Sequence, residues 1–162
     1  LIELCSNNSF TNILEIGFNG GHSSLIMLEN TKAKITSIDL GNHIYVEKGK
    51  NLIDNLYPNR HTLMLGDSKE IISIIDETFD FIFIDGGHDY ETCLSDLTKC
   101  KNISNENTLI YMDDLVYEKP KNWNVGVIKV WKELKDKKII NEIDYKFFGK
   151  GKGRGLCKYI YN

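Results

Sequence analysis

Residues 79–85 read Phe-Asp-Phe-Ile-Phe-Ile-Asp and give the clearest strand signal in the chain. Apolar residues follow one another here almost without interruption, which is typical of a strand buried on both faces at the centre of a parallel sheet. Similar short apolar runs lie on both sides of this stretch and alternate with amphipathic segments. The alternation predicts βαβ units and therefore a doubly wound α/β sheet with helices on both faces.

The same pattern places the other elements. We expect four further parallel strands, at residues 12–17, 34–39, 61–65 and 108–112, and helices at residues 23–30, 45–57, 69–76, 90–101 and 123–137. The end of the chain differs, because residues 139–148 and 155–161 read as strands joined only by Gly-Lys-Gly-Lys-Gly-Arg at 149–154. No crossover helix fits between them, so they must pair antiparallel. The sequence thus predicts five parallel strands followed by a C-terminal antiparallel hairpin.

Length and composition narrow the class of protein. The 162 residues fit a single domain covering residues 1–162, and we expect an N-terminal leader to be missing, since the chain begins at Leu1. The formal net charge of −3 gives no electrostatic reason to expect a nucleic-acid partner, and no apolar run is long enough to span a bilayer. The four cysteines lack the spacing of a zinc site, which favours buried thiols and a cytoplasmic location. Assembly into a homodimer is left open.

A glycine-rich turn follows the first expected strand, where residues 15–21 read Glu-Ile-Gly-Phe-Asn-Gly-Gly. Glycine lets the backbone approach a ligand closely, and the N-terminus of the next helix offers unpaired N–H groups. The spacing departs from G-x-G-x-x-G, since two residues separate Gly17 from Gly20. Taken alone, the turn is weak evidence for a ligand, because each glycine also suits an ordinary turn or helix cap.

Acidic residues end the next two strands. Asp39 lies roughly 20 residues after Gly17, where a carboxylate can accept hydrogen bonds from both ribose hydroxyls. Asp67 follows the third strand, within Gly66-Asp67-Ser68, and could meet an adenine amino group. Three acceptor-bearing strand ends in series would line one nucleoside-shaped crevice.

The turn resembles the first motif of the class I S-adenosylmethionine-dependent methyltransferases, commonly E-x-G-x-x-x-G, which Glu15, Gly17 and Gly21 match. The resemblance covers Asn12 to Tyr161 and implies a Rossmann-like sheet with strand order 3-2-1-4-5-7-6. Its terminal hairpin separates it from a nicotinamide-binding domain. The family's acid at the end of strand two holds the ribose, and its residues after strand three contact adenine. The resemblance therefore implies that S-adenosyl-L-methionine is bound by Glu15, Gly17, Phe18, Asn19, Gly20, Gly21, Ser23, Asp39, Leu40, Gly66, Asp67, Ser68 and Asp85.

Further ionisable residues follow the fourth and fifth strands. Asp85 and His88 come after the fourth, and Asp113 and Asp114 come after the fifth. In a doubly wound sheet these two strand ends are neighbours beside the ligand crevice. Three carboxylates there would repel one another unless protons or a cation intervened, and an all-oxygen set suits a hard divalent ion such as Mg²⁺. A hydroxyl acceptor must also lose its proton during methyl transfer, which requires a base or a metal.

This part of the sequence looks like the catechol and caffeoyl-coenzyme A O-methyltransferases. They carry an Asp after strand four, a basic residue three positions on, and an Asp-Asn pair after strand five. The resemblance implies that Asp85, Asp113 and Asp114 are metal ligands and that His88 and Asp85 are catalytic. Two positions depart from the family: His88 stands in place of a lysine, and Asp114 in place of the Asn. With an unperturbed pKa near 6.5, a histidine here could act as a base, as a ligand or as an ordinary loop residue.

We therefore expect methyl transfer from S-adenosyl-L-methionine to a hydroxyl group of a small-molecule acceptor, assisted by Mg²⁺ or another divalent cation. The alternatives are a methyltransferase acting on an RNA ribose or on a sugar or macrolide hydroxyl, a catalytically silent cofactor-binding subunit, and an NAD(H)-binding oxidoreductase. No N-P-P-Y or D-P-P-Y follows the fourth strand, which disfavours methylation of nucleobase amines. The basic residues of 149–154 read as a solvated tip or an anion clamp, and Trp123 and Trp131 as packing residues.

Overall fold

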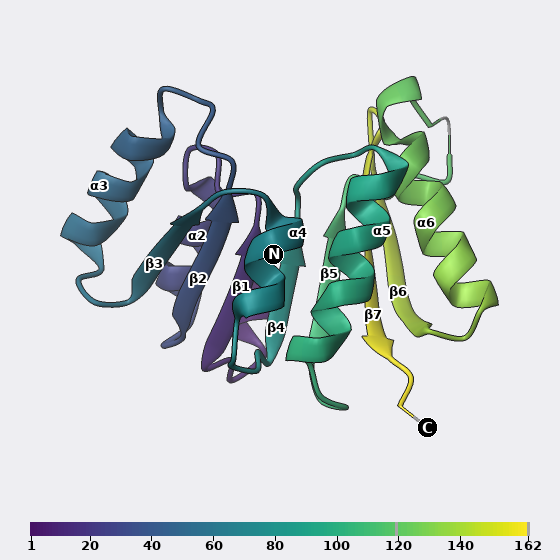
Figure 1. Ribbon diagram of the computed structural model, residues 1–162, viewed down its shortest axis with the longest axis horizontal. Helices are drawn as coiled ribbons and strands as arrows, with labels where there is room; N and C mark the ends of the chain where they lie inside the picture. Colours follow the sequence, from purple (N-terminus) through teal and green to yellow (C-terminus); the bar gives the residue numbers. More distant parts are fainter. Residues whose placement is uncertain (119, 162) are drawn as a thin grey trace.

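The computed structural model describes residues 1–118 and 120–161 and builds a seven-stranded sheet (Figure 1). The strand order is β3-β2-β1-β4-β5-β7-β6. β1 to β5 run parallel, and β7 runs antiparallel to both β5 and β6. The predicted strand order and the C-terminal antiparallel hairpin are therefore confirmed. The strands are β1 (Asn12–Ile16), β2 (Lys34–Asp39), β3 (His61–Leu65), β4 (Phe81–Ile84), β5 (Leu109–Asp113), β6 (Ile140–Gly149) and β7 (Lys152–Tyr159).

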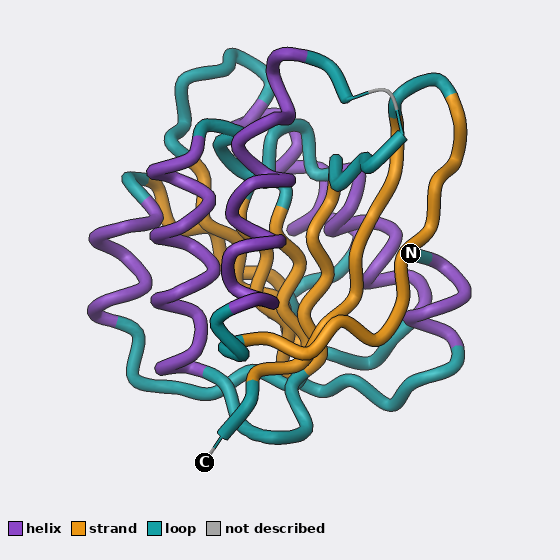
Figure 2. Tube along the Cα trace, turned by 90° about the vertical axis from the view of Figure 1, so that its right-hand side faces the viewer, coloured by secondary structure: helices purple, strands orange, loops and turns teal. Residues whose placement is uncertain are grey.

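Helices cover both faces of this sheet, as the ribbon diagram and the Cα tube show (Figures 1 and 2). In Figure 1, α4 (Ser68–Ile71), α5 (Tyr90–Lys99) and α6 (Val125–Asp136) lie in front of the strands. α1 (Ile2–Ser6), α2 (His22–Asn30) and α3 (Val46–Leu56) pack in sequence against one another and contribute to a second core. The described part of the chain also contains three short 3-10 helices: η1 (Ile72–Ile74), η2 (Cys100–Ile103) and η3 (Asn122–Asn124).

β4 explains why the sheet carries a core on each side. All four of its residues are buried, as its apolar run predicts. Successive side chains of a strand point to opposite faces. Accordingly Ile82 and Ile84 join the cluster packed beneath α5 and α6, whereas Phe81 and Phe83 join the cluster packed against α2.

The last strand begins earlier than the sequence suggests. β6 and β7 are joined by only Lys150 and Gly151, both with positive φ, and β7 already pairs with β6 from Lys152. The glycines that make this segment look like a loop are required by packing inside the strand. A Cβ at Gly155 would lie 2.6 Å from the Trp131 ring, and one at Gly153 would overlap the carbonyl oxygen of Leu115.

Three further differences concern helices. The helix expected at residues 69–76 ends as α4 at Ile71 and continues as η1, and that expected at 90–101 changes from α5 to η2 at Cys100. The short α1 precedes β1, although no helix was expected there. Over residues 1–118 and 120–161, no helix combines the length and the apolar character that crossing a membrane requires.

Candidate functional site

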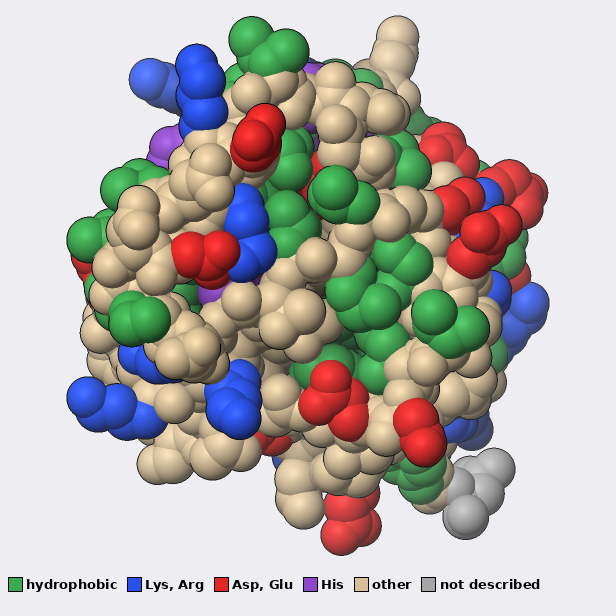
Figure 3. All heavy atoms as spheres, turned by 60° about the vertical axis from the view of Figure 1, so that its left-hand side comes forward, with side chains coloured by type: hydrophobic (Ala, Val, Ile, Leu, Met, Phe, Trp, Pro, Cys, Tyr) green, Lys and Arg blue, Asp and Glu red, His purple; other side chains and the backbone are tan. Residues whose placement is uncertain are grey.

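The carboxyl ends of β1 to β4 surround a cavity of about 450 Å³. In a parallel sheet this is the edge at which ligands bind, because loops leaving neighbouring strands diverge there. Figure 3 shows the molecule from the side of α3 and β3, where hydrophobic side chains are exposed. Leu40, which follows β2, and Leu65, the last residue of β3, are both exposed apolar residues. The cavity is lined by Ile16, Gly17, Asn19, Ile38, Asp39, Leu40, Asn42, His43, Gly66, Asp67, Ser68, Asp85, Gly86, Gly87, His88, Asp89 and Thr92.

The glycine turn has the backbone geometry that its sequence predicts. Gly17 has a φ of +96°, and a Cβ there would overlap the backbone carbonyl of Asp85 at the end of β4. Gly21 has a φ of +79° and lies so close to the Phe18 ring that a Cβ would be 2.8 Å from it. Both positions therefore require glycine, and the turn brings the ends of β1 and β4 together at the cavity.

Asp39 braces the same turn from β2. One of its carboxylate oxygens accepts a 2.8 Å hydrogen bond from the backbone N–H of Asn19, and the other accepts one of 2.8 Å from Gly41. Asn19 has a φ of +51°, a left-handed conformation that asparagine tolerates better than most residues. A carboxylate has about four lone-pair directions, so Asp39 keeps acceptor capacity toward the cavity.

Glu15 lies beneath the cavity and is completely buried. Its carboxylate accepts hydrogen bonds from the hydroxyls of Ser23, Ser24 and Ser37, the last at 2.5 Å. Burial is the largest cause that raises the pKa of Glu15, to about 7. Ser37 also lies 2.9 Å from Nε2 of His61, so a buried chain of polar groups runs from β1 to β3.

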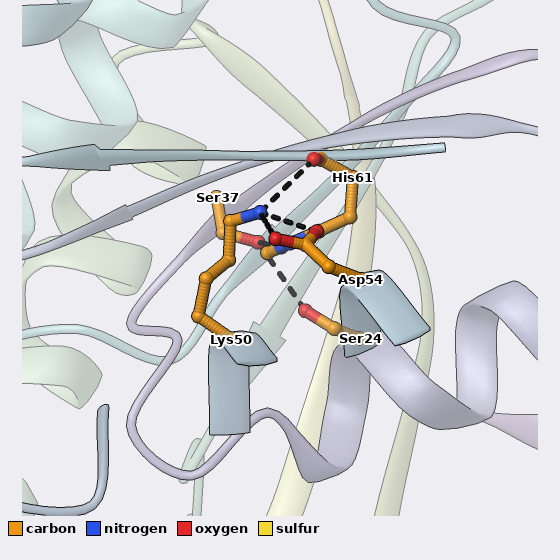
Figure 4. Close-up of polar contacts among 5 residues, drawn as sticks. All are labelled: Ser24, Ser37, Lys50, Asp54 and His61. Atoms are coloured by element: carbon orange, nitrogen blue, oxygen red, sulfur yellow. Dashed lines mark hydrogen bonds and ion pairs between the residues drawn. The ribbon is translucent and has the colours of Figure 1, made fainter. Parts of the chain in front are cut away.

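Figure 4 shows the outer end of this chain, where Lys50 and Asp54 of α3 pair beside His61. The Lys50 ammonium also donates to the His61 carbonyl at 3.4 Å. Burial lowers the pKa of His61 to about 4, so its imidazole is neutral at physiological pH. The His61 ring stacks on Phe18 with ring centroids 5.0 Å apart, which holds the predicted cofactor residue Phe18 in the core.

A second group of ionisable side chains gathers at the ends of β4 and β5. Nε2 of His88 lies 3.0 Å from Oδ2 of Asp114 and 4.0 Å from Oδ1 of Asp85. Burial, followed by the charges of Asp113 and Asp114, raises the pKa of Asp85 to about 7. The hydrogen bond to Asp114 is the main cause that raises the pKa of His88.

The structure therefore brings Asp85, His88 and Asp114 together, with one ligand atom from each within 4.8 Å of the others. Asp113 was predicted beside them, but it is outside this tight group. Burial and the neighbouring Asp114 raise the pKa of Asp113, which shows that it still lies in the same acidic environment.

The predicted residues fall into two sets. Those that line the cavity are Gly17, Asn19, Asp39, Leu40, Gly66, Asp67, Ser68, Asp85 and His88. The remainder lie beneath or beside it: Glu15, Phe18, Gly20, Gly21, Ser23, Asp113 and Asp114.

Sequence reasoning missed several residues at the site. The sequence predicts a packing role for Trp123, yet this residue is 45% exposed and its ring meets the His88 ring edge-on with centroids 4.9 Å apart. Trp131 is buried as expected. His43 and Thr92 line the cavity, although no sequence motif predicts them.

The sequence predicts a flexible tip at Arg154, but this residue lies in β7 and donates a 2.8 Å hydrogen bond to Asp144.

A parallel sheet with this strand order, an antiparallel seventh strand and a cavity at the ends of β1 to β4 defines the class I methyltransferase fold. A protein-family model described as "Methyltransferase domain" matches residues 14–115, from β1 to just beyond β5. The chain therefore belongs to this methyltransferase family. No curated protein sequence matches it.

Solved structures share the fold over nearly the whole chain. The O-methyltransferase TomG from Streptomyces achromogenes, in complex with SAM, is 18% identical, with a TM-score of 0.80 over 98% of this chain and 77% of that one. An O-methyltransferase from Bacillus cereus in complex with SAH is 20% identical, with a TM-score of 0.78 over 98% and 78%. The SAH-bound methyltransferase PaMTH1 of Podospora anserina is 17% identical, with a TM-score of 0.79 over 99% and 76%.

Proposed function

We propose that this protein transfers a methyl group from S-adenosyl-L-methionine to a hydroxyl group of a small-molecule acceptor. The observation that carries the proposal is one continuous site: a cavity bordered by Asp39 and Asp67 opens beside Asp85 and His88. A nucleoside fits the first part, and the second part can take a proton from an acceptor. TomG and the Bacillus cereus enzyme, which share the fold, were solved with SAM and SAH.

The cofactor's place follows from the hydrogen-bonding groups around the cavity. Asp39 has free acceptor directions for ribose hydroxyls, and Asp67 and Ser68 lie where the adenine would end. Leu40 is 63% exposed at the cavity wall, and an apolar side chain of this kind can cover the flat face of a base. Gly17 keeps the backbone close to the ligand, while Glu15 and its serines support the turn from below.

His88 is the general base in this proposal. Ionised Asp114 can only accept a hydrogen bond, so the His88 nitrogen that faces it, Nε2, must carry the proton. Nδ1 then keeps its lone pair and can take the hydroxyl proton. The acceptor oxygen forms its bond to the methyl carbon while the carbon–sulfur bond breaks, and the electron pair stays on sulfur. Asp114 stabilises the imidazolium that results.

A divalent cation fits the chemistry of this donor set. Burial, and then the charges of Asp113 and Asp114, raise the pKa of Asp85 to about 7, and a cation would relieve the repulsion among these three carboxylates. Asp85 and Asp114 would hold the ion together with Asp113, since oxygen ligands suit Mg²⁺. The ion would lower the pKa of an acceptor hydroxyl.

Binding is tested first. S-adenosylhomocysteine at about 100 times its dissociation constant should stabilise the protein by about 2.7 kcal/mol, whereas NAD⁺ should have no effect. Asp39→Asn should weaken this stabilisation, and Asp136→Asn, a change outside the cavity, should not. A protein stabilised by NAD⁺ instead would contradict the proposal.

Turnover is tested next with catechol-like, sugar and ribose hydroxyls, with and without Mg²⁺. His88→Ala should abolish most turnover on the accepted substrate while leaving S-adenosylhomocysteine binding intact. Unchanged turnover would remove His88 as the base. If titration calorimetry detects no heat with Mg²⁺, Mn²⁺ or Ca²⁺ in the presence of cofactor, the proposed metal site is ruled out.

A further inference from the structure

A buried carboxylate lies directly behind the part of the cavity assigned to adenine. Asp96 is on α5, is completely buried, and accepts a 2.7 Å hydrogen bond from the Ser68 hydroxyl. Ser68 lines the cavity at the start of α4. Asp96 and Ser68 are 28 residues apart in sequence, so no local sequence motif predicts that they bond to each other.

The second oxygen of Asp96 lies close to another segment that lines the cavity. Oδ2 is buried, has no hydrogen-bond partner among the residues described, and lies 3.4 Å from the position that a Cβ on Gly86 would take. Gly86 also lines the cavity. Asp96 therefore lies against two lining segments, the one after β3 and the one after β4.

The pair fixes the direction of the Ser68 hydroxyl. Burial raises the pKa of Asp96 to about 6, so near pH 8 the carboxylate is ionised and can only accept. A serine hydroxyl has one hydrogen and two lone pairs. Because its hydrogen is directed at Asp96, Ser68 can present only lone pairs to a ligand in the cavity.

We propose that Asp96 is a positioning residue that makes this cavity selective for a 6-aminopurine over a 6-oxopurine, by holding Ser68 as a hydrogen-bond acceptor. The proposal rests on the proposed function, in which the cavity binds an adenosyl cofactor. The exocyclic amino group of adenine donates hydrogen bonds, whereas the 6-oxo group of hypoxanthine offers lone pairs that repel those of Ser68. The neighbouring Asp67 adds a second carboxylate acceptor and strengthens the same preference.

The test compares S-adenosylhomocysteine with S-inosylhomocysteine, in which a 6-oxo group replaces the 6-amino group and N1 carries a hydrogen, in titration calorimetry near pH 8. Wild-type protein should bind the adenosyl compound about 10- to 100-fold more tightly, the range expected when a buried polar group is left facing a like partner. Ser68→Ala should reduce this ratio, mainly by weakening the adenosyl compound. Asp96→Ala should reduce the ratio as well, because Ser68 can then rotate and donate to the 6-oxo group.

The ratio separates positioning from a general structural effect, which would weaken both compounds equally. Asp96→Asn keeps an acceptor oxygen for Ser68 and should retain most of the ratio. Thr98→Ala is the matched control on α5, because among the residues that the structure describes its hydroxyl bonds only to carbonyls of its own helix. If Asp96→Ala does not fold, the affinity ratio measured for Ser68→Ala tests the inference.

Each result has a distinct meaning. Equal affinity of the wild-type protein for the two compounds, or an unchanged ratio in Ser68→Ala or in Asp96→Ala, overturns the inference but leaves the proposed function standing. Failure of the wild-type protein to bind either compound overturns the proposed function itself.

Discussion

Replacing Glu15 by glutamine should make the protein more stable at alkaline pH. Glu15 is completely buried, and burial raises its pKa from 4.5 to about 7. Between these two values the unfolded chain releases the Glu15 proton while the folded protein keeps it. Folding stability contributed by Glu15 is therefore fully present below pH 4.5 and is lost as the pH rises through about 7.

The size of this loss follows from the difference between the two pKa values. At about 1.4 kcal/mol for each pH unit, it amounts to about 3 kcal/mol once both states are ionised. Glutamine has the same shape, stays neutral, and can still bond to Ser23, Ser24 and Ser37. We expect Glu15→Gln to match the wild-type protein within about 1 kcal/mol near pH 5 and to exceed it by about 3 kcal/mol near pH 8.

Urea unfolding followed by circular dichroism between pH 5 and 8.5 measures both curves. Glu29→Gln is the control, because Glu29 is exposed on α2, the helix that carries Ser23 and Ser24, and it should leave the pH dependence unaltered. If the Glu15→Gln and wild-type curves run parallel across this range, Glu15 does not titrate as its burial requires, and the reasoning is wrong.

Three further predictions concern the site. Asp114→Asn keeps an acceptor oxygen but removes the negative charge that helps to raise the pKa of His88, so the acidic limb of the pH–rate profile, where the base becomes protonated, should move to lower pH. Gly126→Ala places a Cβ 2.7 Å from the Tyr90 nitrogen and closer still to the His88 carbonyl, so it should destabilise the protein by about 1–3 kcal/mol in thermal unfolding and reduce turnover more than cofactor affinity. Gly17→Ala, at a φ of +96° against the end of β4, should weaken S-adenosylhomocysteine binding about tenfold or more in calorimetry.

The fold was predictable because its decisive signals are local. The apolar run of β4 marks a strand buried on both faces, and the short connection between the last two strands leaves only an antiparallel arrangement. The start of β7 was predicted three residues late, since Gly153 and Gly155 read as loop residues. They are in the strand because Leu115 and Trp131 approach it closely, and that contact exists only in the folded chain.

Those residues of the site that lie at strand ends were predictable from the sequence. Asp39, Asp67 and Asp85 line one cavity because the carboxyl ends of parallel strands converge. Asp96 and Trp123 could not be predicted in the same way. One reaches the cavity wall from a helix and the other from a 3-10 turn, and sequence spacing does not define how such elements pack against a sheet.

Because strand ends converge at this site, acidic residues are buried there, and their burial reduces the stability of the fold. Burial raises the pKa of Glu15, Asp85, Asp96 and Asp113, so each contributes stability that is lost as the pH rises toward neutrality. The two hydrophobic clusters of the sheet must offset that loss. Such conflicts with stability are expected where residues serve a ligand. Asp85→Asn should therefore stabilise the folded protein. It also removes the charge that faces His88, so the same carboxylate that the proposed chemistry uses lowers the stability of the fold.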